Sequence, residues 1–162
     1  MIRIVKNTDI QQICDIYNYY VVNTAITFEE TPVSCDDMRA RITSVSALFP
    51  WYVCEAEDGE ITGYAYAAAW KLRSAYRFSA EATVYVKNNF TGKGIGSLLY
   101  SELLKELKKR SFHSVIGGIA LPNEQSRKLH EKFGFKKVAQ FHEVGNKFNG
   151  WIDVGYWQLL LK

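Results

Sequence analysis

Hydrophobic and polar positions along this chain follow two periods, and the changes between them divide it into strands and helices. A period of two predicts strands, and a period near 3.6 predicts helices. The chain therefore begins with a predicted strand at 2–5 and a helix with apolar positions at Ile13 and Ile16. Thr8 and Gln11 have the spacing of a capping box at the start of this helix.

The next segments predict a second helix and a hairpin. Ser34 is a favoured N-cap residue, and the helix that it starts should end before Pro50. Two β-rich apolar runs, 51–57 and 61–70, are joined through Asp58-Gly59. This dipeptide is the strongest hairpin signal in the chain.

Strands and helices alternate in the second half. The predicted elements are a strand at 80–86, a helix from Ile95 with Leu99, Leu103 and Leu107 on one side, a strand at 114–121, a helix from Asn123 that Gly134 ends, and strands at 135–144 and 151–161. Neighbouring strands early and strand-helix units later predict the α/β (α+β) class, with helices on the faces of a mixed sheet.

Length and composition narrow the class of protein. We expect residues 1–162 to form a single domain, because a chain of this length buries about two-thirds of its unfolded surface. A net charge of +3, from 20 basic and 17 acidic residues, argues against a nucleic-acid partner and suits a small anionic ligand.

The cysteines and the amino terminus bear on location. Cys14, Cys35 and Cys54 are odd in number and lack metal-ligand spacing, so we expect reduced thiols and no metal. The start of the chain has no signal-peptide core, and no run of 18 apolar residues occurs. We therefore expect a cytoplasmic protein without a membrane partner.

The run from Glu81 to Ser97 is the most informative, because a strand leads through closely spaced glycines into a helix. Gly92, Gly94 and Gly96 allow close approach of the backbone to an anion, and the helix dipole adds positive potential. A plain turn is the alternative. The Walker pattern fails because Gly94 follows Lys93, and the dinucleotide pattern fails because Ser97 replaces its third glycine.

The element order, the TGKGIG loop and the later NEQSRKLHEKFGF segment resemble the GNAT superfamily of acyl-coenzyme A N-acetyltransferases. WKLRSAY at 70–76, AEATVYV, IALPN and NGWIDVGYWQ resemble the phosphinothricin N-acetyltransferase family within it, over 2–158. The resemblance implies a GNAT-like fold, mostly antiparallel, with helices on both faces. One position departs from the family's Q/R-x-x-G-x-G loop, because Thr91 stands where Arg or Gln is usual.

The resemblance also implies a set of residues that bind acetyl-coenzyme A (acetyl-CoA). Backbone groups of Val84, Tyr85 and Val86 would pair with the pantetheine arm as an added strand does. One of these N–H groups would polarise the thioester carbonyl. The remaining expected cofactor-binding residues are Thr91, Gly92, Lys93, Gly94, Ile95, Gly96, Ser97, Asn123 and Ser126. Capping of a helix alone would also explain Asn123.

Two residues are candidates for proton transfer under the same resemblance. Glu81 would be the general base for an amine nucleophile, more effective if burial raises its pKa. A solvent-facing glutamate at a strand end is the alternative. His130 stands where many members have a tyrosine that protonates the leaving thiolate, and it could also simply fill space beside Leu129. His113 and His142 have no motif around them.

The acceptor site is expected in two loops. The resemblance makes Lys71, Arg73 and Tyr76 a clamp for an acceptor with acidic groups, although a solvated basic loop would look the same. Phe28 and Thr31 are expected to line the acceptor pocket, with core packing as the alternative.

The sequence thus predicts acetyl transfer from acetyl-CoA to the amino group of a small amino-acid-like acceptor such as phosphinothricin or methionine sulfoximine. The reaction would be direct attack in a ternary complex. A protein amino terminus or a polyamine is the alternative acceptor, and a non-catalytic acyl-CoA sensor is the alternative class. The resemblance implies a homodimer, with Phe148, Trp151, Tyr156 and Trp157 as aromatics of either interface or core.

Overall fold

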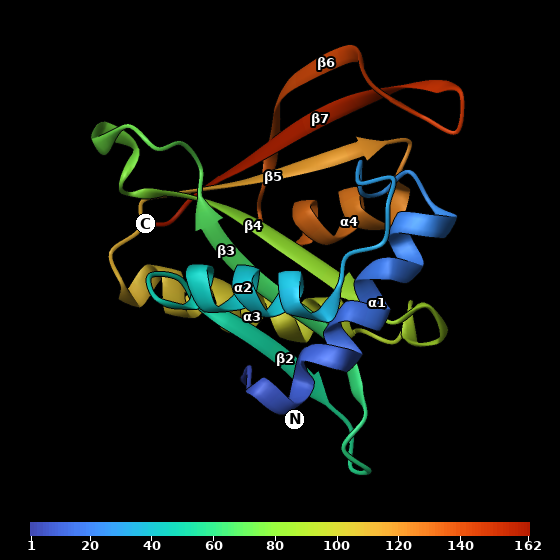
Figure 1. Cartoon of the computed structure of the whole chain (residues 1–162). Helices are drawn as coiled ribbons and strands as arrows, with labels where there is room; N and C mark the ends of the chain where they lie inside the picture. The colour runs from blue at the N-terminus through green and yellow to red at the C-terminus, as the bar shows by residue number, and fades with distance from the viewer.

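The computed structural model describes all residues, 1–162, and is built around one seven-stranded sheet (Figure 1). Its spatial order is β1-β2-β3-β4-β5-β7-β6, and only the β4–β5 pair is parallel. The strands are β1 (Ile2–Ile4), β2 (Trp51–Glu55), β3 (Ile61–Ala69), β4 (Ser79–Val86), β5 (Ser114–Leu121), β6 (Lys136–Lys147) and β7 (Gly150–Leu160). The expected α/β class and mostly antiparallel sheet are confirmed.

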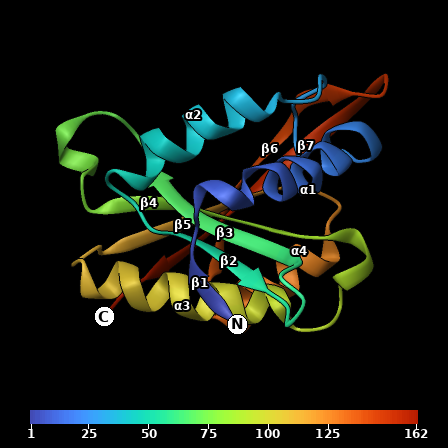
Figure 2. The same cartoon turned by 60° about the horizontal axis from the view of Figure 1, so that its bottom comes forward.

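Four helices cover the two faces of the sheet. They are α1 (Ile10–Asn23), α2 (Cys35–Ser46), α3 (Ile95–Lys109) and α4 (Glu124–Lys132). Helices α1 and α2 lie on one face, and α3 and α4 lie on the other (Figure 2). Two buried clusters correspond to these faces, one around Ile13 and Tyr64 beneath α1 and α2, the other around Leu103 and Trp157 beneath α3 and α4.

Most local signals in the sequence act as predicted, and one does not. The Ser34 hydroxyl accepts a hydrogen bond from the Asp37 N–H (3.1 Å) and caps α2. Gly59, at φ +85°, makes the turn between β2 and β3. The capping box at Thr8 is wrong. A short 3₁₀ turn (Asn7–Asp9) precedes α1, and the Asp9 carboxylate accepts from the Lys6 N–H instead (2.7 Å).

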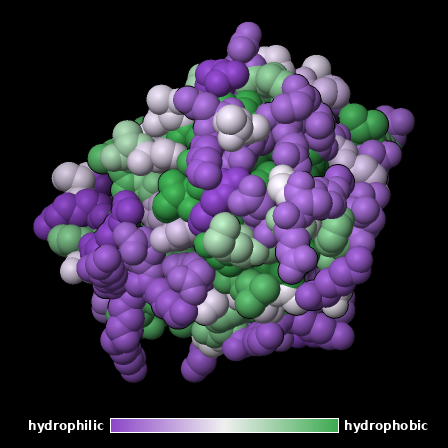
Figure 3. Space-filling model, turned by 90° about the horizontal axis from the view of Figure 1, so that it is seen from below, coloured by the Kyte–Doolittle hydropathy of each residue, from purple (hydrophilic) through white to green (hydrophobic).

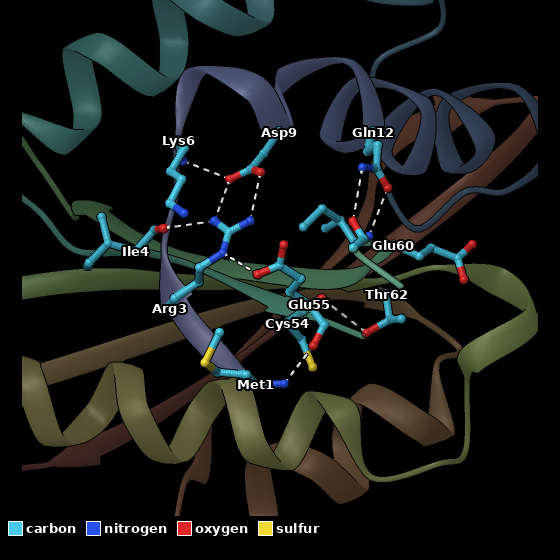
Figure 4. A network of polar contacts seen from close by, with 12 residues as sticks. Met1, Arg3, Ile4, Lys6, Asp9, Gln12, Cys54, Glu55, Glu60 and Thr62 are labelled. Carbon is cyan, nitrogen blue, oxygen red and sulfur yellow. Dashed lines mark hydrogen bonds and ion pairs between the residues drawn. The ribbon is translucent and has the colours of Figure 1, made fainter. Parts of the chain in front are cut away.

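A network of polar contacts fixes the amino terminus to the sheet (Figure 4). The Arg3 guanidinium donates two hydrogen bonds to Asp9 (2.8 and 2.9 Å) and one to Glu55 (2.6 Å). Gln12 extends the network by accepting from the Ile61 N–H (2.8 Å). Strand β1 and the start of α1 are thereby joined to β2 and β3.

The sheet opens between its two central strands. Strands β4 and β5 pair only from Ser79 to Glu81 with Ser114 to Ile116, and their later residues diverge. The sheet therefore consists of a β1–β4 half and a β5–β7–β6 half that remain joined at one end. Polar backbone groups left without a strand partner in such a gap need other partners.

The surface carries scattered apolar residues. Seen from below, the molecule is largely hydrophilic with hydrophobic patches between (Figure 3). Of the aromatics near the carboxyl end, Trp157 is buried in the core, whereas Phe148 and Trp151 are exposed. None of the helices has the length and apolar character that crossing a membrane would require.

Candidate active site

The hydrogen-bond ladder between β3 and β4 determines which way the backbone of β4 faces. The Lys87 N–H donates to the Thr62 carbonyl (2.9 Å), and the Trp70 N–H donates to the Ser79 carbonyl (3.4 Å). These two pairs fix the register, in which odd-numbered residues of β4 form the hydrogen-bonded pairs with β3. Even-numbered residues must direct their N–H and C=O groups away from β3, because the two kinds of pair alternate.

Ala82, Val84 and Val86 face away from β3, and of these Val84 and Val86 lie beyond the last pair with β5, where β5 has diverged. The Ala82 carbonyl accepts from the Tyr100 hydroxyl (3.4 Å) and the Val86 carbonyl from the Tyr20 hydroxyl, and no strand pairs with Val84 or Val86 on this side. Tyr85 pairs with Tyr64 of β3, so its backbone does not face the gap. Val84 and Val86 are therefore the residues of the expected trio that can hydrogen-bond a ligand lying between β4 and β5.

The glycine loop continues from this gap into α3. Gly92 (φ +77°) and Gly94 (φ +83°) both have left-handed conformations, which residues with a Cβ rarely adopt. Gly94 is the N-cap of α3, and no side chain caps the helix. The first N–H groups of α3 remain available, and they form a natural anion site together with the helix dipole.

A groove of about 330 Å³ runs along β4, the glycine loop and α4. Eleven of the twelve expected cofactor-binding residues line it: Val84, Tyr85, Val86, Thr91, Gly92, Gly94, Ile95, Gly96, Ser97, Asn123 and Ser126. Lys93 does not, because its ammonium lies over the Phe90 ring, 4.6 Å from the centroid. Sequence reasoning missed Lys128 and Lys132 of α4, which line the groove at i and i+4, a spacing that places both on one helix face.

Thr91, the departure from the family loop pattern, uses its hydroxyl within the loop. The Thr91 Oγ1 donates to the Asn88 carbonyl (3.0 Å), at the end of a short 3₁₀ turn (Asn88–Phe90). The side chain thus fixes the loop that precedes Gly92, and its hydroxyl proton is already committed.

A second cavity of about 320 Å³ adjoins the groove and contains both proton-transfer candidates. It shares Ile26, Val84, Tyr85, Asn123 and Ser126 with the groove, so the two spaces lie side by side. Glu81 lines it and has no hydrogen-bond partner in the protein. Burial raises the pKa of Glu81, and the charge of Lys71 opposes the rise. A carboxylate with a raised pKa that faces a cavity is suited to accept a proton.

His130 reaches the same cavity from α4, and its partners fix its tautomer. The ring is 3% exposed, with Nδ1 2.8 Å from the Ser126 carbonyl and Nε2 2.9 Å from the Tyr100 hydroxyl. A carbonyl can only accept, so Nδ1 carries the proton and Nε2 accepts from Tyr100. Burial lowers the pKa of His130, although the bond to Ser126 opposes this, and the imidazole is held neutral.

Tyr100 is a site residue that the sequence did not reveal. It belongs to α3, is fully buried and lines the cavity with His130. Burial and the charge of Glu81 both raise the pKa of its hydroxyl, so the hydroxyl keeps its proton. Its neighbours Leu99, Leu103 and Leu107 make a tyrosine here look like core packing.

Two consecutive glycines of β5 lie beside these groups, and Gly117 makes room for His130. A Cβ at Gly117 would lie 2.2 Å from His130 Nε2, and a Cβ at Gly118 would lie 3.5 Å from Glu81 Oε1. Successive strand residues face opposite sides of a sheet, so His130 and Glu81 approach β5 from opposite faces. Two glycines inside a predicted strand are the sequence signal that could have indicated this close approach.

Only one of the residues expected to bind the acceptor lines the cavity of Glu81. Phe28 lines the cavity of Glu81, together with Thr27, whereas Thr31 is exposed and lies outside its lining. Lys71, Arg73 and Tyr76 are exposed and outside the lining as well. Their loop does reach the rim, because the ring of neighbouring Trp70 packs edge-on against Tyr156 of the cavity, 5.6 Å between centroids.

A family model described as an acetyltransferase (GNAT) domain matches residues 2–155. The chain belongs to the GNAT acetyltransferases. The acetyl donor of this family is acetyl-CoA, and the chain is an N-acetyltransferase. The groove suits such a donor because it combines free strand groups at Val84 and Val86, which match a pantetheine arm, with a glycine loop that matches a pyrophosphate.

Curated relatives of this GNAT chain are similar over nearly its whole length. A phosphinothricin N-acetyltransferase of Streptomyces viridochromogenes is 38% identical over 157 residues, covering 97% of this chain and 85% of the relative. An L-methionine sulfoximine/L-methionine sulfone acetyltransferase of Salmonella typhimurium is 35% identical over 161 residues, covering 99% of this chain and 94% of the relative.

Solved structures agree with the fold. A phosphinothricin acetyltransferase of Sinorhizobium meliloti in complex with acetyl-CoA superposes with a TM-score of 0.97 at 34% identity, covering 99% of this chain and 88% of the other. The crystal structure of a ribosomal-protein-alanine N-acetyltransferase from Brucella melitensis gives a TM-score of 0.96 at 34% identity and covers 99% of both chains. In the GNAT chain itself, no group of three or more His, Cys, Asp or Glu residues is arranged to hold a metal ion.

Proposed function

We propose that this GNAT enzyme acetylates the α-amino group of a small amino-acid-like acceptor of the phosphinothricin or methionine sulfoximine type. The observation that carries the proposal is the cavity that holds Glu81 and adjoins the cofactor groove, with which it shares five lining residues. Its volume of about 320 Å³ suits a small molecule, and relatives named for these two acceptors support the acceptor class.

In the proposed reaction both substrates are bound together. Glu81 takes a proton from the acceptor ammonium, directly or through a water, and the free amine attacks the acetyl carbonyl carbon. The new C–N bond replaces the C–S bond, the nitrogen loses its second proton, and the departing sulfur gains one. A free N–H of Val84 or Val86 faces the gap where the carbonyl oxygen would develop negative charge.

The His130–Tyr100 pair is proposed to act at the sulfur. Because His130 is neutral and its Nδ1 proton is bound to Ser126, the imidazole cannot serve as a pre-charged acid. Tyr100 and His130 both line the cavity. In the hydrogen bond between them, the Tyr100 hydroxyl carries the proton and Nε2 of His130 accepts it, which orients the hydroxyl. We therefore propose that the single Tyr100 O–H turns from Nε2 of His130 toward the sulfur as the thiolate leaves, so that Tyr100 donates there and His130 holds the hydroxyl beforehand.

The acceptor's acidic group is proposed to lie toward the 70–76 loop. Lys71 acts on Glu81 through its charge, and Trp70 holds the loop at the cavity rim through Tyr156. Arg73 and Tyr76 would complete the clamp if the loop folds over a bound acceptor. A polyamine would meet positive charge here, which argues against it as the acceptor.

Release of free thiol from acetyl-CoA tests the proposal, with phosphinothricin, methionine sulfoximine, spermidine and an alanine-terminated peptide as separate acceptors. We expect release with the first two. Release with the peptide alone would favour a protein amino terminus, the kind of acceptor for which the Brucella protein is named. Tight acetyl-CoA binding without release from any acceptor would favour a sensing module.

A further inference from the structure

Lys147 is a buried lysine that no carboxylate neutralises at contact distance. It is the last residue of β6, its exposed fraction is 3%, and its Nζ donates to the carbonyls of Val21 (2.7 Å) and Thr27 (2.9 Å). Burial lowers the pKa of Lys147, and the more distant charges of Glu30 and Glu29 oppose this. Burying an ammonium costs free energy that an apolar side chain of similar length would not, so its presence calls for a reason.

The two carbonyls that Lys147 binds belong to the other half of the molecule. Val21 lies in the last turn of α1, where carbonyls have no partner in the helix and a positive charge matches the dipole. Thr27 lies in the loop between α1 and α2, beside Phe28, and both line the cavity of Glu81. Lys147 thus connects the β5–β7–β6 half to the helix and loop that cover the β1–β4 half.

A second contact joins the same hairpin to the same loop. A Cβ at Gly145 would lie 2.3 Å from Cε2 of Phe28, so the Phe28 ring rests directly on the backbone of β6. Without a side chain at Gly145, the ring can occupy this place and still line the cavity.

Other parts of the loop are held independently of Lys147. The Val33 N–H donates to the Asn18 side chain (2.8 Å), and that side chain donates back to the Val33 carbonyl (2.9 Å). The Tyr17 hydroxyl is 2.8 Å from Thr27 Oγ1. Loss of Lys147 would therefore leave these contacts in place and remove the tie between the Thr27 carbonyl, beside Phe28, and β6.

We propose that Lys147 is a positioning residue that ties the β6–β7 hairpin to the α1–α2 loop across the open end of the cleft, and so holds the acceptor pocket in its binding shape. This inference rests on the proposed function, since it concerns the acceptor side of the same site. The join between β4 and β5 closes one end of the sheet gap, and Lys147 bridges its two sides near the acceptor.

The test uses Lys147→Met, which keeps the length and apolar stem of the side chain and removes its donors. Lys136→Met, at the exposed start of the same strand, is the matched control. We expect KM for the acceptor to rise about tenfold in Lys147→Met, because a smaller fraction of the loop is binding-competent. KM for acetyl-CoA should be unchanged, and Lys136→Met should match the parent enzyme.

Hydrogen exchange of residues 24–34 supplies a readout that does not depend on any acceptor. We expect faster exchange there in Lys147→Met, with the glycine loop at 91–97 unaffected. If no acceptor in the panel supports thiol release, the proposed function fails, and this exchange measurement still decides whether Lys147 holds the loop.

Gly145→Ala provides a second variant that leaves all charges in place. Its Cβ must displace the Phe28 ring, so KM for the acceptor should again rise while KM for acetyl-CoA stays constant. The inference is overturned if Lys147→Met leaves both the acceptor KM and the exchange of 24–34 unchanged. It is equally overturned if the two KM values rise together, which would indicate a general disturbance of the fold.

Discussion

At the scale of single residues, Glu81 and His130 approach β5 from opposite faces of the sheet, and Gly117 leaves free the space that His130 Nε2 occupies. Glu81 was predicted as the general base because a strand-end glutamate before a glycine loop resembles the family's pattern. Tyr100 and Gly117 were not predicted, since their place in the site depends on contact with His130, which is distant in the sequence. A tyrosine in a leucine-rich helix and a glycine in an apolar strand look like ordinary core residues.

Replacement of Glu81 by Gln should lower kcat by about 10²–10⁴-fold, the usual contribution of a general base, with little effect on acetyl-CoA binding. The base must be unprotonated, so kcat/KM of the parent enzyme should fall as pH drops through the pKa of Glu81. Burial raises that pKa above its ordinary value of 4.5, and the midpoint should lie above 4.5. A pH profile of thiol release checks this.

Lys71 supplies the control for that profile. Its charge holds the pKa of Glu81 down, so Lys71→Met should move the acidic limb to higher pH, whereas Lys71→Arg should leave it in place. An acidic limb that persists unchanged in Glu81→Gln would assign it to another group.

Gly117 and Gly118 form a matched pair for testing the position of His130. Gly117→Ala should lower kcat markedly, because its methyl group would need the place of His130 Nε2. Gly118→Ala meets its nearest atom, Tyr156 Cε1, at 3.2 Å and requires only a small shift. Steady-state kinetics and thermal melting of both variants check the prediction, which fails if the two variants lose activity equally.

At the scale of elements, α3 and α4 end in the same motif with different residues. In both, the second residue after the cap donates its N–H to a carbonyl five residues back: Phe112 to Leu107 (3.0 Å) and Phe135 to His130 (3.2 Å). Gly134 takes the left-handed position in α4, as the sequence predicted, and Ser111 takes it in α3 at φ +63°. Serine is not typical of the left-handed conformation, so the sequence could not predict that Ser111 would end α3 in this way.

Ser111→Gly should stabilise the protein by about 0.5–1 kcal/mol, because glycine adopts the left-handed conformation without the Cβ penalty. Gly134→Ala should destabilise it by a similar amount, about 1 kcal/mol. Urea unfolding measures both free energies of unfolding. A loss of stability in Ser111→Gly would show that the serine side chain contributes something the backbone geometry does not explain.

At the start of α1, by contrast, the local sequence pattern predicted a cap that the structure does not have. Thr8 and Gln11 have capping-box spacing, yet they do not cap α1. The residue directly before the helix is Asp9, whose carboxylate accepts two hydrogen bonds from Arg3 of β1. Gln11 bonds to Asp15 along the helix instead (2.9 Å). The pair between Arg3 and Asp9 joins two elements, and a local spacing of residues does not show such a pair.

At the scale of the whole molecule, the Arg3 network joins β1 and α1 to β2. Asp9 is 3% exposed, and burial alone would raise its pKa, but hydrogen bonds from Arg3 and the Lys6 N–H outweigh this and lower it below 3.8. A carboxyl whose pKa is lowered by folding stabilises the protein above its unfolded-state pKa. That stabilisation is lost as pH falls through the folded-state pKa.

Asp9→Asn should therefore reduce the free energy of unfolding by about 1.5–3 kcal/mol at pH 7, the range for hydrogen bonds to charged groups. The difference from the parent protein should shrink below about pH 4, where the unfolded carboxyl becomes protonated. Denaturation at several pH values checks this, with exposed Glu57→Gln as the control. A difference that stays constant with pH would mean that charge is not its source.

The order of elements was predictable from the sequence, but the gap between β4 and β5 was not. Both strands look like ordinary apolar strands, and their divergence after three residue pairs depends on contacts between distant segments. The same is true of Lys147, whose burial against Val21 and Thr27 joins positions more than a hundred residues apart. Only a resemblance could indicate a cleft there in advance.

The direction of the β4 backbone bears on how such a site changes over evolutionary time. The groups that we propose to bind the donor at Val84 and Val86 are backbone groups that every residue except proline possesses, so a mutational scan should find these positions tolerant of many side chains. Binding of the donor by these two backbone positions can then be retained while their side chains change. Such tolerance is compatible with the Sinorhizobium meliloti structure, which shares the fold at a TM-score of 0.97 with 34% identical residues.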